Sequence, residues 1–202
     1  MKSGDCMYFA FEDRRSIRKY KEQDVPKDII EKILQAGILA PSSKNRQPWR
    51  FIVMTGATKA DMVSVMRCGI EREKQAPLLP DSSKYISGAE YTAKIMQQAP
   101  VTIFIVNPLG ADLQKQLTPE ERIYEICNAQ SVGAAIENMA LAATGLGLGS
   151  LWICDTYFAY PELKEWLGID GEIFAALIVG YADEEPAARP RKTLEEVTEW
   201  RG

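Results

Sequence analysis

Histidine is absent from this 202-residue sequence, which excludes every mechanism that needs an imidazole. Ser-His-Asp and Cys-His hydrolysis are ruled out, and so is catalysis by a His-ligated metal. Cysteine is scarce: the four cysteines are widely spaced and form no Cys-x-x-Cys pair, so we expect neither a zinc site nor a disulfide framework. Scattered cysteines fit a reducing environment, and we expect a cytoplasmic protein.

Long apolar runs and an excess of basic charge are also missing. No stretch of about 20 uncharged apolar residues occurs, so we expect no membrane span. Residues 1–16 lack the apolar core of a signal peptide. The formal net charge of −4 argues against a general nucleic-acid partner, so any basic site must be a local cluster.

Four apolar segments predict buried strands, at residues 49–54, 101–106, 151–154 and 173–182. Between them, helical patterns start at Pro26, cover about 59–69 and 89–98, and occupy 161–167 before Gly168. Residues 71–88 are expected to be irregular, and 107–117 to form a loop. Since no linker or internal repeat divides the chain, we expect a single domain over residues 1–202, of class α/β or α+β.

A long helix is predicted from Thr118 to about Thr144, because Thr118 and Glu121 have the spacing of a capping box. Its middle is rich in alanine and glycine, which suits either a dimer seam or an ordinary core helix. Gly145, Gly147 and Gly149 follow this helix and open a strand. A dinucleotide-binding fingerprint has the opposite order, so we expect no Rossmann site here.

Two polar motifs are candidates for binding. Arg14-Arg15-Ser16-Ile17-Arg18 places three guanidinium groups within five residues, as a phosphate site requires, although a solvated basic surface would look the same. The segment 40–49, Ala-Pro-Ser-Ser-Lys-Asn-Arg-Gln-Pro-Trp, sets hydroxyl and amide side chains between a helix and a strand. It can be a binding loop or a capped turn.

These two motifs, in this order and spacing, resemble the FMN-dependent nitroreductase family. The segment Gly-Leu-Gly-Leu-Gly-Ser-Leu-Trp-Ile at 145–153 and the Arg-Pro-Arg at 189–191 agree with it. The resemblance covers nearly the whole chain. It implies an α+β nitroreductase-like fold, with a mainly antiparallel central sheet flanked by helices and a long central helix. It also implies a homodimer with FMN at the subunit interface and a C-terminal extension that reaches the partner.

The resemblance further implies roles for individual residues. The phosphate, ribityl chain and pyrimidine edge of FMN would be held by Arg14, Ser16 and Arg18, with Arg15 nearby and Arg189 and Arg191 closing on the phosphate. A loop from the partner subunit would contribute Ser42, Ser43, Asn45 and Gln47. Lys94 would reach the pyrimidine oxygens, and a backbone amide near Cys154 and Asp155 would donate a hydrogen bond to flavin N5.

The implied activity is hydride transfer from NADH or NADPH, followed by reduction of a nitroaromatic, quinone or related acceptor in a ping-pong mechanism. No catalytic side chain and no metal is expected, since the flavin carries the chemistry. Trp152, Tyr157 and Phe158 can line the acceptor pocket or belong to the core, and 71–88 and 107–117 can supply a lid. Cys154 is interpreted as a small packing residue rather than a nucleophile. Alternatives are an FMN carrier or redox sensor without turnover, a reductive dehalogenase or flavin-modifying relative of the same fold, and a structural protein without flavin.

Overall fold

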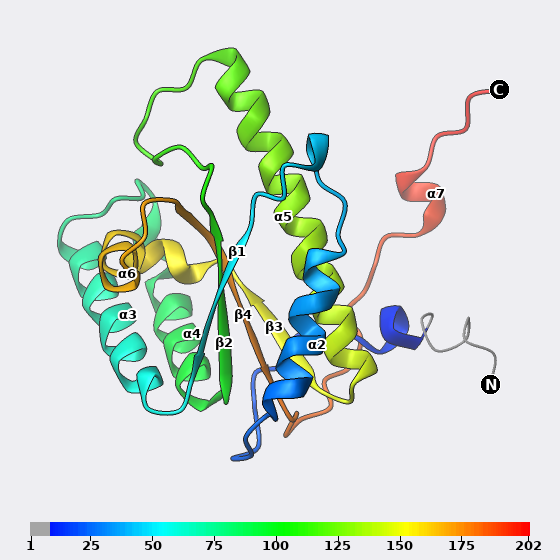
Figure 1. The fold of residues 1–202 in the computed structure, drawn as a ribbon, viewed down its shortest axis with the longest axis horizontal. Helices are drawn as coiled ribbons and strands as arrows, with labels where there is room; N and C mark the ends of the chain where they lie inside the picture. Colours follow the sequence, from blue (N-terminus) through cyan, green and yellow to red (C-terminus); the bar gives the residue numbers. More distant parts are fainter. Residues whose placement is uncertain (1–8) are drawn as a thin grey trace.

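The computed structural model describes residues 9–202, and a four-stranded sheet lies at its centre (Figure 1). The strands are β1 (Arg50–Thr55), β2 (Val101–Asn107), β3 (Gly149–Ile153) and β4 (Glu172–Gly180). Their spatial order is β1-β2-β4-β3, and every neighbouring pair is antiparallel. The predicted α+β class with an antiparallel sheet is therefore confirmed. Cys6 and the first half of the stretch considered for a signal peptide lie outside the described residues.

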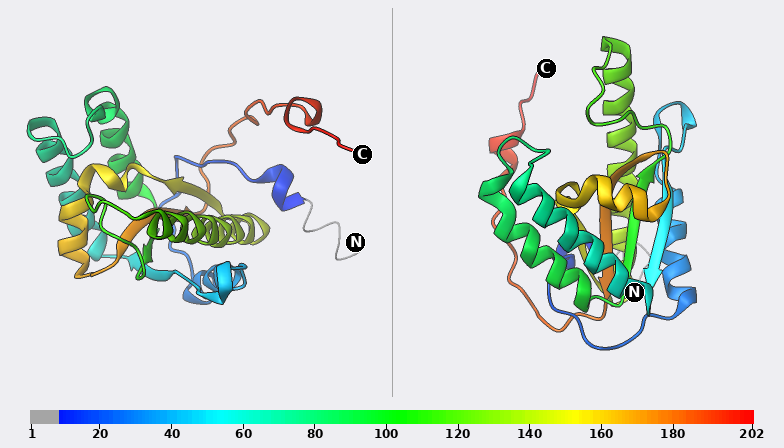
Figure 2. Two further views of the ribbon diagram at one scale, coloured as in Figure 1. Left: turned by 90° about the horizontal axis from the view of Figure 1, so that it is seen from above. Right: turned by 90° about the vertical axis from the view of Figure 1, so that its left-hand side faces the viewer.

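The two central strands are apolar on both faces because helices cover both faces of the sheet. Ile103 and Ile105 of β2 pack into one core cluster, whereas Phe104 and Val106 pack into the other. The first cluster lies against α2 (Lys27–Ile38) and α5 (Pro119–Gly145); the second lies against α3 (Thr58–Gln75), α4 (Ile86–Gln98) and α6 (Tyr160–Leu167). Figure 2 shows these two helical layers on opposite sides of the sheet. Strand alternation thus explains why the continuous apolar runs were readable as buried strands.

Helix α5 begins where its capping box predicts. The Thr118 hydroxyl accepts from the Glu121 amide at 3.2 Å, and the Glu121 carboxylate accepts from the Thr118 amide at 2.9 Å. The second half of α5 is core: Met139 packs so closely on α2 that a Cβ at Gly37 would lie 2.8 Å from its Cγ. The first half projects beyond the sheet with exposed apolar side chains, those of Ile123, Tyr124 and Ile126 (Figure 1).

The expected end of α3 and the expected irregular stretch 71–88 are partly wrong. Helix α3 continues through Gly69 to Gln75, and α4 begins at Ile86, with a short 3₁₀ turn over Ser82–Tyr85 between them. Gly69 does not end the helix, because a Cβ there would lie 2.3 Å from Ala159. Because glycine has no side chain, α3 can pack closely against the segment after β3. The buried Ile70 then continues the apolar face of the helix.

The N-terminal segment and the chain after β4 lie side by side next to β3. Ser16 bridges Ser150 of β3 in parallel, and Tyr20 pairs with Ala182. The contact depends on glycine, since a Cβ at Gly149 would lie 2.6 Å from Ile17. Beyond residue 185 the chain leaves the body as a tail that carries α7 (Leu194–Val197), where Thr193 and Glu196 form a second capping box (Figure 1).

Candidate functional site

A cavity of about 240 Å³, called here the arginine cavity, lies where the N-terminal segment meets the beginning of the tail. Its lining includes all six residues of the two arginine motifs that were predicted to bind FMN, namely Arg14, Arg15, Ser16, Arg18, Arg189 and Arg191. The lining holds five arginines and one acidic residue, Glu12, so it is strongly positive. Guanidinium groups bind phosphate and carboxylate through paired, charge-assisted hydrogen bonds, so this cavity suits an anion.

The arginines of the N-terminal segment are oriented by local contacts. Arg14 Nε lies 3.3 Å from Glu137 Oε1 of α5, which ties the start of the segment to the central helix. Arg18 Nη1 donates to the Ser16 carbonyl at 3.1 Å. The backbone itself is fixed by Ile17 N, which donates to the Ser150 carbonyl at 3.0 Å. The cluster therefore has a defined position at the edge of the sheet.

The outer edge of β3 is unpaired beyond Ser150 among the described residues. Because the Ser150 carbonyl points away from β4, strand alternation directs the amides of Trp152 and Cys154 outward as well. In the described chain, neither of these two amides has a hydrogen-bond acceptor in the sheet or in the adjoining turns. The edge thus offers two free backbone donors about 7 Å apart, beyond the point where Ser16 of the arginine cavity bridges Ser150.

A second cavity, of about 760 Å³, lies at the far end of this edge and is called here the β3-end cavity. Cys154, Asp155, Tyr157 and Phe158 line one side of it, and residues between Leu79 and Gly88 line the other. Burial, and then the neighbouring Asp155, raise the pKa of the Cys154 thiol. A raised pKa disfavours the thiolate and agrees with the expectation that Cys154 is no nucleophile. The predicted packing role is wrong, because Cys154 is exposed and lies just beyond the end of β3.

The wall of the β3-end cavity is held by a buried carboxylate that the sequence did not single out. Glu73 accepts from the amides of Leu78 and Leu79, both at 2.9 Å. Burial alone would raise the pKa of Glu73, but these two amides and the Ser82 and Arg72 side chains lower it below its usual range. Glu73 is therefore ionised and anchors the turn that follows α3. Its only sequence signal is a charge in a polar stretch, which carries no information about this role.

The loop 42–47 does not line the arginine cavity of its own chain. It packs on α5, where the Ser43 amide donates to the Ser131 hydroxyl at 3.2 Å. The Gln47 amide donates to the Ser42 hydroxyl at 3.0 Å. Asn45 and Gln47 have φ of 52° and 48°, in the left-handed region that non-glycine residues seldom adopt. The loop thus has a shape imposed by its own contacts, and within one chain it stays apart from the arginine cluster.

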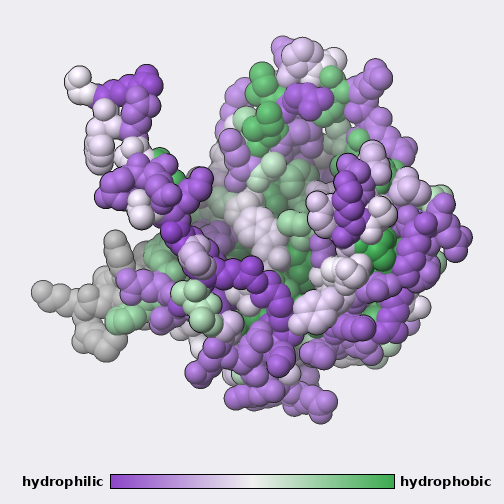
Figure 3. Space-filling view, turned by 180° about the vertical axis from the view of Figure 1, so that it is seen from behind, coloured by the Kyte–Doolittle hydropathy of each residue, from purple (hydrophilic) through white to green (hydrophobic). Residues whose placement is uncertain are grey.

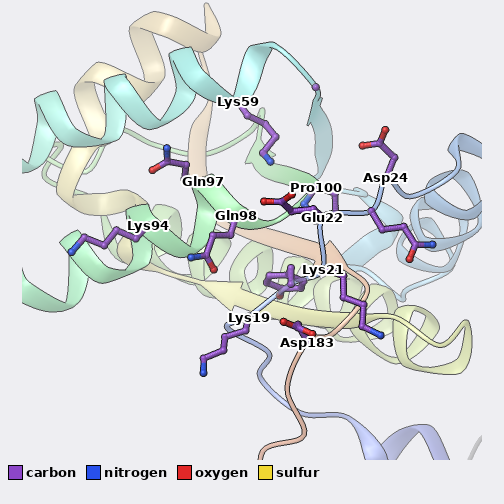
Figure 4. A pocket seen from close by; sticks show the side chains of 13 residues that line it. Lys19, Lys21, Glu22, Asp24, Lys59, Lys94, Gln97, Gln98, Pro100 and Asp183 are labelled. Carbon is purple, nitrogen blue, oxygen red and sulfur yellow. The ribbon is translucent and has the colours of Figure 1, made fainter.

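Lys94 also lies elsewhere. It projects from α4 at the rim of a wide polar cavity of about 1250 Å³, together with Lys19, Lys59, Gln97 and Gln98 (Figure 4). In Figure 4 the Lys94 side chain points away from the other side chains of this cavity. The structure therefore does not bring Lys94 to the arginine cavity, and its role toward a flavin stays a prediction.

Neither a membrane helix nor a metal cluster occurs in the part of the chain that the structure describes. No helix there is both long and apolar enough to cross a bilayer. Within residues 9–202, no three Cys, Asp or Glu side chains gather in a way that could hold a metal ion.

Comparison with known proteins assigns the family. The model of the nitroreductase family matches residues 11–181. An Archaeoglobus fulgidus protein, provisionally named NADH dehydrogenase/NAD(P)H nitroreductase, is 32% identical over 189 residues, which cover 90% of this chain and 87% of that protein. The chain thus belongs to the nitroreductase family of oxidoreductases, as its motifs predicted.

Solved structures agree with the fold. A provisionally named nitroreductase of Desulfovibrio desulfuricans in complex with FMN has a TM-score of 0.71 and 26% identity, with 97% of both chains covered. The FMN-dependent nitroreductase NfnB of Mycobacterium smegmatis in complex with NADPH has a TM-score of 0.74 and 17% identity, with 98% of this chain and 99% of that chain covered. The predicted nitroreductase-like fold is confirmed.

Proposed function

We propose that this protein binds FMN, takes hydride from NADH or NADPH and reduces an organic acceptor such as a nitroaromatic compound or a quinone. The observation that carries the proposal is the arginine cavity beside the free edge of β3. A phosphate monoester has a charge of about −1.5 to −2 near pH 7, which suits a cavity with five guanidinium groups. The FMN and NADPH complexes of the relatives named above support the same cofactors.

In this proposal the phosphate binds Arg14, Arg189 and Arg191, and Ser16 and Arg18 hold the ribityl chain and the pyrimidine edge. The ring would then be held beside β3, whose outward amides can donate to it. An amide near Cys154 and Asp155 donates a hydrogen bond to the ring, in the role predicted for flavin N5. The fit is chemical: acceptor-rich ring edges need donors, and the edge of β3 presents donors with no partner among the described residues.

FMN, when bound, supplies the hydride acceptance and the two-electron donation of such a reaction. The chain itself supplies placement and charge. The Arg18 guanidinium stabilises negative charge at the pyrimidine edge, as charged donors do in other active sites. No acid or base side chain is assigned. Donor and acceptor would occupy the same site in turn, which predicts ping-pong kinetics.

The β3-end cavity is the proposed site of the acceptor. It adjoins the end of β3, and the aromatic rings of Tyr85, Tyr157 and Phe158 line it. Flat aromatic molecules stack well on such rings. The Tyr85 side chain is largely exposed, so the segment 79–88 supplies the outer wall, as the lid hypothesis requires.

We further propose a homodimer in which Ser42, Ser43, Asn45 and Gln47 reach the flavin of the partner subunit. The apolar side chains on the projecting half of α5, together with the exposed Leu39, form a surface that a second copy would bury. The tail carries Leu194, Val197 and Trp200 exposed and stands clear of the body, as Figure 3 shows. In the dimer this tail would pack on the partner.

The test is a visible spectrum of the purified protein, followed by anaerobic titration with NADH and with NADPH. Flavin absorbance that bleaches with one nicotinamide and returns on addition of a nitroaromatic compound or a quinone supports the proposal. Colour that persists through both titrations points to a carrier or sensor. Turnover of halogenated phenols alone would favour a reductive dehalogenase. Protein that shows no flavin bands after incubation with FMN refutes the proposal.

A further inference from the structure

We propose that Glu184 is a positioning residue that holds the N-terminal segment in the form that binds the phosphate. The inference rests on the proposed function, because it assumes that the arginine cavity receives the phosphate of FMN. Glu184 follows β4 in the segment that leads into the tail, and neither a binding nor a catalytic role had been predicted for it from the sequence.

The Glu184 carboxylate binds the backbone of the arginine cluster directly. Its Oε1 accepts from the amide of Arg18 and, at 3.2 Å, from the amide of Lys19. The Asp183 amide donates in the reverse direction to the Lys19 carbonyl at 2.9 Å. Residues 18–19 and 183–184 are therefore joined by three hydrogen bonds, although Arg18 and Glu184 are 166 positions apart in the sequence.

These bonds connect the two groups of arginines. Arg18 belongs to the N-terminal group, whereas the tail that carries Arg189 and Arg191 starts directly after Glu184. Beyond residue 185 no hydrogen bond joins the tail to the body among the described residues, so Glu184 is the last such anchor before the second group. Loss of the carboxylate would remove two of these three hydrogen bonds, at the point where both groups of arginines are connected.

The carboxylate acts through the backbone rather than by neutralising guanidinium groups. Glu184 lines a separate cavity of about 550 Å³ together with Ile17 and Gly149, and it is absent from the lining of the arginine cavity. It forms no ion pair within 4.0 Å with an arginine of the described chain. Its negative charge thus lies outside the lining of the arginine cavity, which keeps its excess of positive charge.

Charge and positioning predict opposite effects, and the difference makes a sharp test. If Glu184 acted only as a nearby negative charge, its removal would strengthen phosphate binding at low salt. If it positions the backbone, its removal weakens phosphate binding. The effect on the phosphate is isolated by comparing FMN with riboflavin, which lacks the phosphate. The ratio of the riboflavin Kd to the FMN Kd is the phosphate preference, measured by quenching of flavin fluorescence.

Three substitutions at Glu184 separate the effect of side-chain length from the effect of negative charge. Glu184→Ala removes the acceptor, Glu184→Asp keeps the charge but shortens the reach, and Glu184→Gln removes the charge but keeps an acceptor oxygen at full reach. We expect the Ala and Asp variants to lose about tenfold or more of the phosphate preference and the Gln variant to stay within about threefold of the wild type. The matched control is Glu185→Ala, which removes the same charge from the neighbouring exposed position and should stay within about threefold.

Each outcome decides the matter. Ala and Asp variants that keep the wild-type preference overturn the inference, as does a Gln variant that loses as much as the Ala variant. An equal loss of riboflavin and FMN affinity in the Ala variant also overturns it, since that marks a general loss of structure. If the Ala variant does not fold, the Asp and Gln variants give the same comparison. A wild-type protein without phosphate preference refutes the proposed placement of FMN itself, independently of Glu184.

Discussion

Replacing Arg14 with alanine tests the arginine cavity most directly. Arg14 lines the cavity, its side chain is about three-quarters buried, and its only ion pair in the described chain is with Glu137. Arg14→Ala therefore removes a donor fork from the proposed phosphate site without opening the hydrophobic core. It also leaves the Glu137 carboxylate beside the site without its cation.

The expected loss follows from these contacts. A hydrogen bond to a charged group contributes about 1.5–3 kcal/mol. The competing pair with Glu137 is partly exposed and contributes at most about 1 kcal/mol. The net loss is then about 2 kcal/mol, or roughly 30-fold in the Kd for FMN. Adding Glu137→Gln to Arg14→Ala removes the remaining carboxylate and should recover several-fold of that affinity.

The assay is titration of FMN by fluorescence quenching at low and at high salt, with thermal unfolding of the apoprotein as a check on folding. Arg67→Ala is the matched control, since Arg67 lies on the surface of α3 and donates only to Gln97 at 3.0 Å. The control should bind FMN as the wild type does. An unchanged FMN affinity in Arg14→Ala would remove Arg14 from the site and contradict the reasoning.

Three further predictions concern stability, packing and assembly. Burial, and then Asp112 and Glu125, raise the pKa of Glu172 from 4.5 to about 7. Since the folded-state pKa lies above the ordinary value, stability is lost as pH rises from 4.5 through about 7. Lys164 Nζ, which donates to Glu172 Oε1 at 2.8 Å, offsets part of this cost. Glu172→Gln should therefore raise the free energy of unfolding, measured in urea, by about 1–2 kcal/mol at pH 8 and by much less at pH 4.5. Equal effects at both pH values would contradict this prediction. Gly149→Ala should destabilise the fold by about 1–3 kcal/mol and weaken FMN binding, because its Cβ would displace Ile17; wild-type values for both would show that the segment adapts freely. Ile126→Glu places a charge on the exposed face of α5. The variant should run as a monomer in size-exclusion chromatography and should release FMN on dilution. A variant that stays dimeric and keeps its flavin would exclude this face from the interface.

The sequence predicts those parts of the fold that depend on residues close together in the chain. The central strands are continuous apolar runs because both of their faces are covered, and their bounds shifted by only a residue or two. The start of α5 depends on Thr118 and Glu121, which lie within one helical turn of each other. The end of α3 was misjudged because Gly69 serves a contact with Ala159, which is distant in sequence.

The sequence predicts only part of the site, because contacts between residues distant in the chain leave no local pattern. The arginines were found because like charges close in sequence suggest a bound anion. Glu73 and Glu184 were missed, since each acts on backbone amides that only the folded chain brings to it. The loop 42–47 stays a prediction: its expected target belongs to a second chain, and no pattern within one chain specifies that encounter.

The closure of the arginine cavity by residues from both ends of the chain has a consequence for biosynthesis. Residues 14–18 are synthesised long before Glu184, Arg189 and Arg191. A nascent chain that has completed three of the four strands still lacks one half of this cavity. If this cavity holds the flavin phosphate as proposed, translation products truncated before Glu184 should be unable to sequester the cofactor.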